Sequence, residues 1–400
     1  MEQNYRLLGG VLLVAGTTIG GGMLGLPILI GTAGFIPSLF VSFLCWLFMA
    51  STGLLFLEVS QWIKGESNII SMAECTLGLF GKYFAWTLYL FLFNCLLIAY
   101  LVGAGNLLSE LFFHSLPSWA GPLLFALFFS PLIIISTVIT TRLNSFLVLG
   151  LALSYLGVVI LGARYVSPEL LKQMYWSHSI HILPIAFISF GFQGIIPTLT
   201  TYMQRDFAQT RRALLIGSFI PFVAYAIWNG VILGIVPVEG EAGLLDALSK
   251  GQNAITPLKN FISDPLFYQV GQAFAFFALV TSFLGVALGL RDFLADGLKI
   301  KKNFSGKCLL AFLVCAFPLV IAISYPHLFL VALGYAGGFG SALLLGLLPI
   351  IMAWSGRYYL HLEEKKRQLP GGKGVLLLLT LFVCFELFME TRLLIEKLFF

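Results

Sequence analysis

The 400-residue sequence has little charge: 10% of its residues are Asp, Glu, Lys or Arg, and 59% are hydrophobic. A soluble domain carries about 25% charged residues and needs polar groups to cover its core. This shortage excludes an ordinary soluble fold. The apolar excess instead suits lipid, where each membrane span needs roughly 20 predominantly apolar residues.

Metal, redox and catalytic motifs are also missing. The six cysteines form no CxxC pair, and His178 and His181 have no third ligand nearby. Gly20–Gly25 matches GxGxxG, but without the strand and the acidic residue about 20 positions later that dinucleotide binding requires. We therefore expect no metal, no cofactor and no enzymatic activity. The net charge of +5 is spread over loops, so we expect no nucleic-acid partner.

Long apolar runs predict an all-α polytopic membrane protein, with residues 1–400 forming a single membrane transport domain. Of the 23 Lys and Arg residues, 17 fall in segments on the same side as the amino terminus. The positive-inside rule then places the amino terminus in the cytoplasm and, after eleven spans, the carboxyl terminus outside. The predicted spans are 7–33, 36–62, 83–113, 119–139, 143–163, 180–202, 214–236, 266–290, 309–324, 328–354 and 375–394.

Two of these spans contain clusters of helix-breaking residues. Gly16–Gly22 holds four glycines, each costing about 1 kcal/mol relative to Ala inside a helix. Close helix packing is the alternative, but Gly20–Gly22 circle the helix instead of lining one face. In Ser189–Thr198, two glycines accompany Pro197, which cannot donate a backbone hydrogen bond. We predict that the first and sixth spans are both interrupted.

The spacing of the interruptions predicts an inverted repeat. The sixth span crosses the bilayer in the opposite direction to the first, because it comes five spans later and five is an odd number. Corresponding broken helices that meet near the midplane indicate the binding site of a transporter. Repeat one covers about 7–163, repeat two about 180–354, and the helix at about 375–394 is an addition.

Such a site suits an amino acid. The half-helix that starts near Gly21 presents N–H groups favourable to a carboxylate. Carbonyls near Gly16–Thr18 and Ser189–Gly191 can accept from an ammonium group, and aromatic walls would suit an aromatic side chain. The predicted substrate-binding residues are Gly16, Thr17, Thr18, Gly20, Gly21, Gly22, Ser189 and Gly191 for the main chain, and Asn94, Tyr100, Phe190, Phe192, Phe283 and Tyr335 for the side chain.

Carboxylates inside spans are candidates for function. For Glu58, in the second span, a structural hydrogen bond and a role in proton coupling are equally favoured. Glu386 and Glu390 lie one turn apart in the last span, outside the repeat, and are given no role in transport.

Five segments resemble bacterial aromatic amino acid permeases, the hydroxy/aromatic amino acid permease family of the amino acid–polyamine–organocation superfamily. The resemblance runs from the first span to the tenth and is strongest to tyrosine-specific members. It implies a LeuT-type five-plus-five inverted repeat in the bacterial cytoplasmic (inner) membrane. It also implies import of tyrosine, with tryptophan or phenylalanine as alternatives, in symport with a proton. The segments are VAGTTIGGGMLGLP (14–27), LLFLEV (54–59), ISFGFQGIIPTLTTYM (188–203), VTSFLGVALGLRDFLAD (280–296) and LFLVALGYAGG (328–338).

The chain departs from the family pattern at two positions that bear on the ion. Gln193, a further substrate-binding candidate, replaces a histidine of the family; glutamine can hydrogen-bond but cannot titrate near neutral pH. The fifth span also lacks the lysine that relatives carry a few residues after Asn144. Thr281 and Ser282, with carbonyls near Ala15, have oxygens that a sodium site would use. Sodium coupling, exchange and another neutral amino acid therefore stay open as alternatives.

Overall fold

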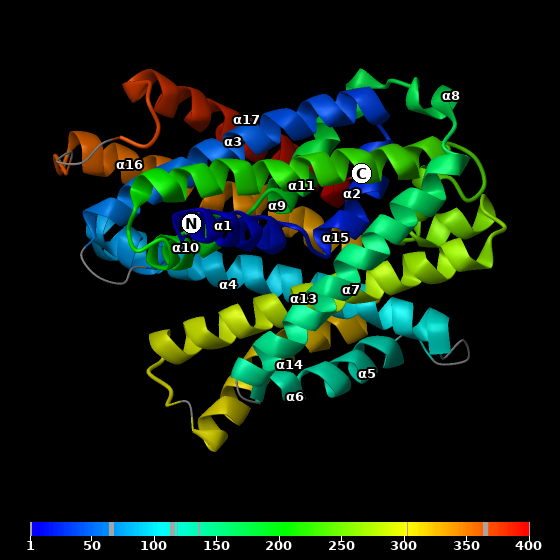
Figure 1. Cartoon of the computed structure of the whole chain (residues 1–400), viewed down its shortest axis with the longest axis horizontal. Coiled ribbons are helices and arrows are strands. Elements are labelled where there is room, and N and C mark those ends of the chain that lie inside the picture. Colours follow the sequence, from blue (N-terminus) through cyan, green and yellow to red (C-terminus); the bar gives the residue numbers. More distant parts are fainter. Residues whose placement is uncertain are drawn as a thin grey trace.

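The computed structural model describes residues 2–63, 68–112, 117, 119–134, 137–301, 303–362 and 367–399. Every regular element in these ranges is a helix. The helices form an elongated bundle, and most of them run along its long axis (Figure 1). The amino terminus lies at the left of this view; we call that end of the bundle the N-terminal end and the opposite one the far end.

The longer helices are α1 (Glu2–Thr18), α2 (Gly22–Gly31), α3 (Phe35–Trp62), α4 (Ile69–Phe112), α5 (Ala120–Phe129), α7 (Thr137–Gly162), α11 (Phe207–Ile235), α13 (Pro265–Gly297), α14 (Phe304–Ser324), α16 (Leu348–Tyr358) and α17 (Gly372–Phe399). The shorter α-helices are α6 (Pro131–Ile134), α8 (Pro168–Leu171), α9 (Leu183–Ser189), α10 (Ile196–Tyr202), α12 (Leu244–Ser249) and α15 (Phe329–Tyr335). The remaining elements are the 3₁₀ segments η1 (Ala163–Tyr165), η2 (Trp176–Ile182), η3 (Gln193–Ile195) and η4 (Thr256–Asn260), and the π-helix η5 (Ala336–Leu347).

These helices confirm the predicted polytopic architecture. Within the described ranges, nine helices are long and apolar enough to cross a membrane, or ten when α1 and α2 count as one bent span. The shorter apolar segment Ala120–Ile134 lies where the fourth span was predicted. The tenth span is divided into α15, η5 and α16, and nothing in the sequence indicated its π-helical middle.

The first span is broken, but over a shorter stretch than predicted. Helix α1 continues through Gly16 and Thr17 to Thr18, and α2 begins at Gly22 with its axis bent by 59°. The non-helical backbone is therefore Ile19–Gly21, not Gly16–Gly22. A single glycine at position 16 weakens the helix without ending it, whereas three consecutive glycines end it.

The sixth span is also broken over a shorter stretch. Helix α9 ends at Ser189, Phe190–Phe192 are non-helical, and the turn η3 leads into α10. Pro197 belongs to the first turn of α10. Its missing N–H has no helical partner to lose at that position, so Pro197 begins the second half-helix and does not interrupt it.

The packing of the helices brings the two breaks to the middle of the bundle. The half-helices α2 and α9 pack against each other, and α11 packs against α1, α2 and α3. On the other side, α13 packs against α4 and α7. The last helix, α17, covers η5, which itself packs on α9.

Candidate functional site

The two breaks face each other. A Cβ atom added to Gly22 would have one neighbour within 4 Å, the hydroxyl oxygen of Ser189 at 3.6 Å. Ser189 is buried, and its hydroxyl has no hydrogen-bond partner in the described part of the chain. Close to the start of α2 there is therefore a buried polar group that remains available to a ligand.

A tyrosine of α11 joins the two breaks. The Tyr225 hydroxyl lies 2.8 Å from the carbonyl oxygen of Thr18 and 3.2 Å from that of Ser189. Both carbonyls were predicted to accept from a substrate ammonium group. One hydroxyl hydrogen is shared between them, and each carbonyl has two lone pairs, so both keep some capacity to accept. Tyr225 was not predicted, because nothing in the sequence distinguishes it from the other tyrosines of this chain.

Residues of two other helices close around the first break. The backbone N–H of Gly21 donates to the Ser282 hydroxyl of α13 at 2.7 Å. A Cβ atom on Gly21 would lie 2.6 Å from Cε1 of Tyr100, and one on Gly20 would lie 2.5 Å from the Ser282 oxygen. Only glycine permits these close approaches. The N–H group expected to bind a carboxylate thus has a partner, Ser282, which was predicted as an ion ligand.

The second break is fastened to α3 by Gln193. Its buried amide donates to the carbonyl oxygen of Met49 at 3.1 Å and to the Thr52 hydroxyl at 3.0 Å. Its side-chain oxygen accepts from the N–H of Phe192 at 2.9 Å. The Phe192 ring also faces α3, where a Cβ atom on Gly53 would lie 2.8 Å from its Cζ. Gln193 and Phe192 therefore hold the break in place from the side of α3.

The other predicted aromatic residues lie in different places. Phe190 is buried at the second break, with its ring 5.5 Å from that of Tyr225. Phe283 is fully buried, and its ring lies 5.2 Å from Phe125 of α5. The structure therefore brings Phe190 to the junction of the breaks, whereas Phe283 packs against the fourth span.

Three further candidates, Asn94, Gly191 and Tyr335, make separate contacts. The Asn94 amide donates to the carbonyl of Leu90 in its own helix at 2.7 Å. A Cβ atom on Gly191 would meet Leu345 of η5 at 3.1 Å. Tyr335 lines a cavity of about 910 Å³ between α2, η2, α9, α12, α15 and α17.

The atoms suggested for a sodium site have local partners. The Thr281 hydroxyl donates to the carbonyl of Phe277 at 2.7 Å, and the Ala15 carbonyl accepts from the N–H of Ile19 at 3.0 Å. These bonds do not remove the lone pairs of the Thr281 oxygen. They show that each of these two groups already has a hydrogen-bond partner within the protein.

Glu58 has a structural partner that the sequence did not reveal. Its carboxylate receives two hydrogen bonds from the Arg357 guanidinium of α16, at 2.6 and 2.8 Å, and one from the N–H of Gln368 at 2.7 Å. Arg357 also donates to the carbonyl of Leu369 at 3.1 Å. Both charged side chains are buried. Of the two roles weighed for Glu58, this geometry favours the structural one, because losing either partner of a buried pair is costly.

Open space lies on one side of the breaks. A Cβ atom on Gly16, Gly194 or Gly285 would meet no atom within 4 Å, and all three glycines are exposed, as is Thr17. Eight of the ten residues of α2 are buried, and a Cβ atom on Gly25 would come within 2.9 Å of a Leu333 methyl group. The breaks are therefore accessible from the N-terminal end and closed by packing toward the far end.

Comparisons of the sequence identify similar proteins along most of the chain. Residues 3–389 match the profile of the tryptophan/tyrosine permease family. The tyrosine-specific transport system 1 of Haemophilus influenzae is 32% identical over 361 residues, covering 88% of both chains. The tryptophan-specific transport protein of the same organism is 27% identical over 377 residues, covering 89% of both chains.

Solved structures share the fold at low sequence identity. A manganese transporter of Eremococcus coleocola, in complex with an aromatic bis-isothiourea compound, superposes with a TM-score of 0.62 at 15% identity. The match covers 96% of this chain and 85% of the other. MhsT in complex with L-phenylalanine gives a TM-score of 0.58 at 14% identity, covering 95% and 98%. Both neighbours have the LeuT-type architecture expected from the two broken spans.

Proposed function

The chain belongs to the tryptophan/tyrosine permease family, and we propose that it imports an aromatic amino acid, tyrosine first, across the bacterial inner membrane by proton symport. Its family and its apolar helices make it a multi-pass membrane transporter and not an enzyme. The alternatives are tryptophan or another neutral amino acid as substrate, and sodium coupling or exchange as mechanism.

The observation that carries this proposal is the meeting of two broken helices around Tyr225. An amino acid carries a carboxylate and an ammonium group a few ångströms apart, and half-helix ends offer N–H and carbonyl groups to both. In our proposal the carboxylate binds at the start of α2, beside Gly22. The ammonium group binds the carbonyls of Thr18 and Ser189, where it competes with the Tyr225 hydroxyl.

Aromatic side chains near this junction support an aromatic substrate. Tyr100 covers the first break and Phe190 lines the second. The structure of MhsT, which has a similar fold, contains L-phenylalanine, and this supports an aromatic amino acid as substrate. The 32% identity to a tyrosine-specific relative is the reason for naming tyrosine first.

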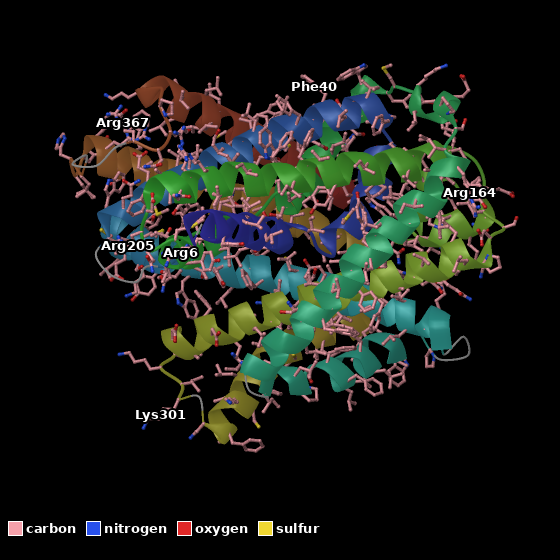
Figure 2. The ribbon with its side chains drawn as sticks, viewed as in Figure 1. Arg6, Phe40, Arg164, Arg205, Lys301 and Arg367 are labelled. Carbon is pink, nitrogen blue, oxygen red and sulfur yellow. The ribbon has the colours of Figure 1, made fainter. Side chains whose placement is uncertain are left out.

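Charge supports the proposed orientation. Figure 2 shows Arg6, Arg205, Arg367 and Lys301 toward the N-terminal end, with Arg164 toward the far end. By the positive-inside rule, this distribution supports a cytoplasmic N-terminal end. With this orientation the open space beside the breaks faces the cytoplasm, so the conformation is inward-facing. Transport would proceed by alternating access, with the bundle that contains the breaks rocking against the rest.

The test is uptake of labelled tyrosine, tryptophan and leucine by purified protein in proteoliposomes, with proton and sodium gradients imposed separately. We expect an inward proton gradient to accumulate tyrosine and a protonophore to abolish that accumulation. If only a sodium gradient drives accumulation, the coupling ion is sodium and not the proton. Failure of every aromatic amino acid to compete would reject the substrate class.

A further inference from the structure

One buried carboxylic acid lies outside the site described above. Glu386 of α17 is 1% exposed, and neither of its carboxylate oxygens has a hydrogen-bond partner in the described part of the chain. An ionised carboxylate without partners is strongly disfavoured in apolar surroundings. In this conformation the stable form of Glu386 is therefore the neutral acid, which holds a proton.

Glu386 lies on the face of α17 that packs against the π-helix η5. A Cβ atom on Gly338 would come within 2.7 Å of the Glu390 side chain, and one on Gly346 would come within 3.2 Å of Val383. Residues 383, 386 and 390 share one helix face because they are three and four positions apart. Glu386 is thus directed toward the π-helical part of the tenth span.

The same π-helix packs against α9, the half-helix that ends at the second break. A Cβ atom on Gly337 would lie 1.7 Å from the carbonyl oxygen of Pro184. Ser341 of η5 is fully buried, and its hydroxyl, like that of Ser189, lacks a hydrogen-bond partner among the described residues. Three neighbouring elements, α17, η5 and α9, therefore each carry a buried polar side chain with unused hydrogen-bonding capacity.

Aromatic contacts also connect α17 directly to α9. The ring of Phe382 lies 6.0 Å from that of Phe187 in α9 and 5.0 Å from that of Phe48 in α3. A movement of α9 during transport would consequently be transmitted to the turn of α17 that contains Glu386.

Water can approach Glu386 from the far end. The cavity of about 910 Å³ is lined by Glu390, one turn from Glu386 on the same helix, and by His181 and Tyr335. The cavity therefore reaches Glu390, one helix turn from Glu386.

The other titratable groups near Glu386 offer no positive charge to hold it ionised. Glu390, on its own helix, and Cys45 of α3 are close enough to interact with it electrostatically. The segments η5 and α9 contain no titratable residue. On α16 the Arg357 guanidinium is engaged by Glu58.

We propose that Glu386 carries the coupling proton, an inference that rests on the proposed proton symport. With the site open to the outside, a proton from water in the far-end cavity passes by Glu390 and forms the O–H bond of Glu386. The inward-facing structure shows Glu386 before release of this proton. Further movement of α9, transmitted through Phe187 and Phe382, then opens Glu386 to cytoplasmic water, to which the proton passes as the O–H bond breaks. Gln193 cannot titrate, so the carrier must be a different residue.

The test compares Glu386→Gln with Glu396→Gln in proteoliposomes. Glutamine imitates the neutral acid, and Glu396 is an exposed residue of the same helix, paired with Arg392. A gradient of two pH units supports about 100-fold accumulation per coupled proton, since each unit is a tenfold ratio. We expect wild type and Glu396→Gln to accumulate tyrosine. Glu386→Gln should only equalise the tyrosine concentrations inside and outside, a ratio of about 1. It should retain tyrosine counterflow, which needs no net proton movement.

Infrared difference spectroscopy supplies a second readout. We expect the carbonyl stretch of a protonated carboxylic acid in wild type and in Glu396→Gln, and its loss in Glu386→Gln. Absence of this band in wild type would contradict a proton on Glu386. Accumulation by Glu386→Gln equal to wild type would overturn this inference and leave proton symport standing. Wild type that fails to accumulate tyrosine under a proton gradient would reject both.

Discussion

The break in the first span and the break in the sixth differ in how their backbone groups are satisfied. At the first, the chain supplies glycines, and its Gly21 N–H is bound by Ser282 from α13. At the second, Gln193 of the break itself binds the neighbouring N–H and reaches across to α3. Tyr225 is the one described side chain whose hydroxyl reaches carbonyls of both breaks.

The two breaks occupy corresponding positions in the inverted repeat, but they are stabilised in different ways. The first break requires residues without a side chain. A Cβ atom on Gly20 would collide with Ser282, and one on Gly21 would collide with Tyr100. The second depends on hydrogen bonds made by one buried amide. Substitutions should therefore act by collision at the first break and by lost hydrogen bonds at the second.

The largest effect is expected for Gly21→Leu. Its Cβ atom would come within 2.6 Å of Tyr100, and the larger side chain would fill the proposed carboxylate position. Uptake of labelled tyrosine should fall to background while immunoblots show normal amounts in the membrane. Gly194→Ala is the control, because its Cβ atom would meet no atom within 4 Å. Normal uptake by Gly21→Leu would remove the first break from the site.

Gln193→Leu should have the next largest effect. It leaves the buried N–H of Phe192 without a partner and frees the break from α3, and an unsatisfied buried group costs about 1–3 kcal/mol. We expect apparent affinity for tyrosine to fall about tenfold to 100-fold, with the proton dependence unchanged. Thr52→Val, which removes only one of these hydrogen bonds, should lower the apparent affinity for tyrosine by a smaller factor. A changed ion dependence in Gln193→Leu would point instead to a role in coupling.

Tyr225→Phe should have a smaller effect. It removes the hydroxyl that links the two breaks, but it also frees the carbonyls of Thr18 and Ser189 for the substrate ammonium group, which offsets part of the loss. A net loss of about 1 kcal/mol corresponds to about fivefold slower uptake. Tyr155→Phe is the matched control, since its hydroxyl donates to the Ala224 carbonyl of the same α11 at 2.9 Å, without contacting either break. Equal uptake by the two variants would argue against a link between the breaks.

Ser282→Ala should be mildest, because Ser282 is only partly buried and water can replace its lost hydroxyl. We expect uptake to fall by about twofold to threefold, the effect of a fraction of one hydrogen bond. Thr281→Val, which changes a hydroxyl bonded within its own helix, should stay closer to wild type. A larger loss in Thr281→Val, together with sodium dependence, would support an ion site there.

Much of the fold could be predicted because its signals are local. Apolar run length gave the spans, and clusters of glycine and proline gave both interruptions. The exact limits of the breaks were wrong, since Gly16 and Pro197 weaken a helix in general but are compatible with a helix interior and a helix start, respectively. The π-helix of the tenth span, which packs against α9 and α17, was not predicted, because no local pattern in the sequence indicates it.

The site was less predictable because its key contacts join distant segments. Tyr225 is separated from Thr18 by 207 positions, and Ser282 from Gly21 by 261. Glu386 was set aside because α17 lies outside the repeat, yet only the structure shows that its carboxylate is buried and without hydrogen-bond partners.

The Glu58–Arg357 pair has a consequence for the synthesis and membrane insertion of the protein. Its two members are 299 positions apart, and ribosomes add about 5–20 residues per second. Glu58 therefore enters the membrane roughly 15–60 s before its partner has been synthesised. Glu58 lies one turn from the end of α3, so its carboxylate can stay at the lipid–water boundary until Arg357 is inserted. A chain arrested before the tenth span would keep this charge unpaired, which would allow quality-control proteases to distinguish it from the finished transporter.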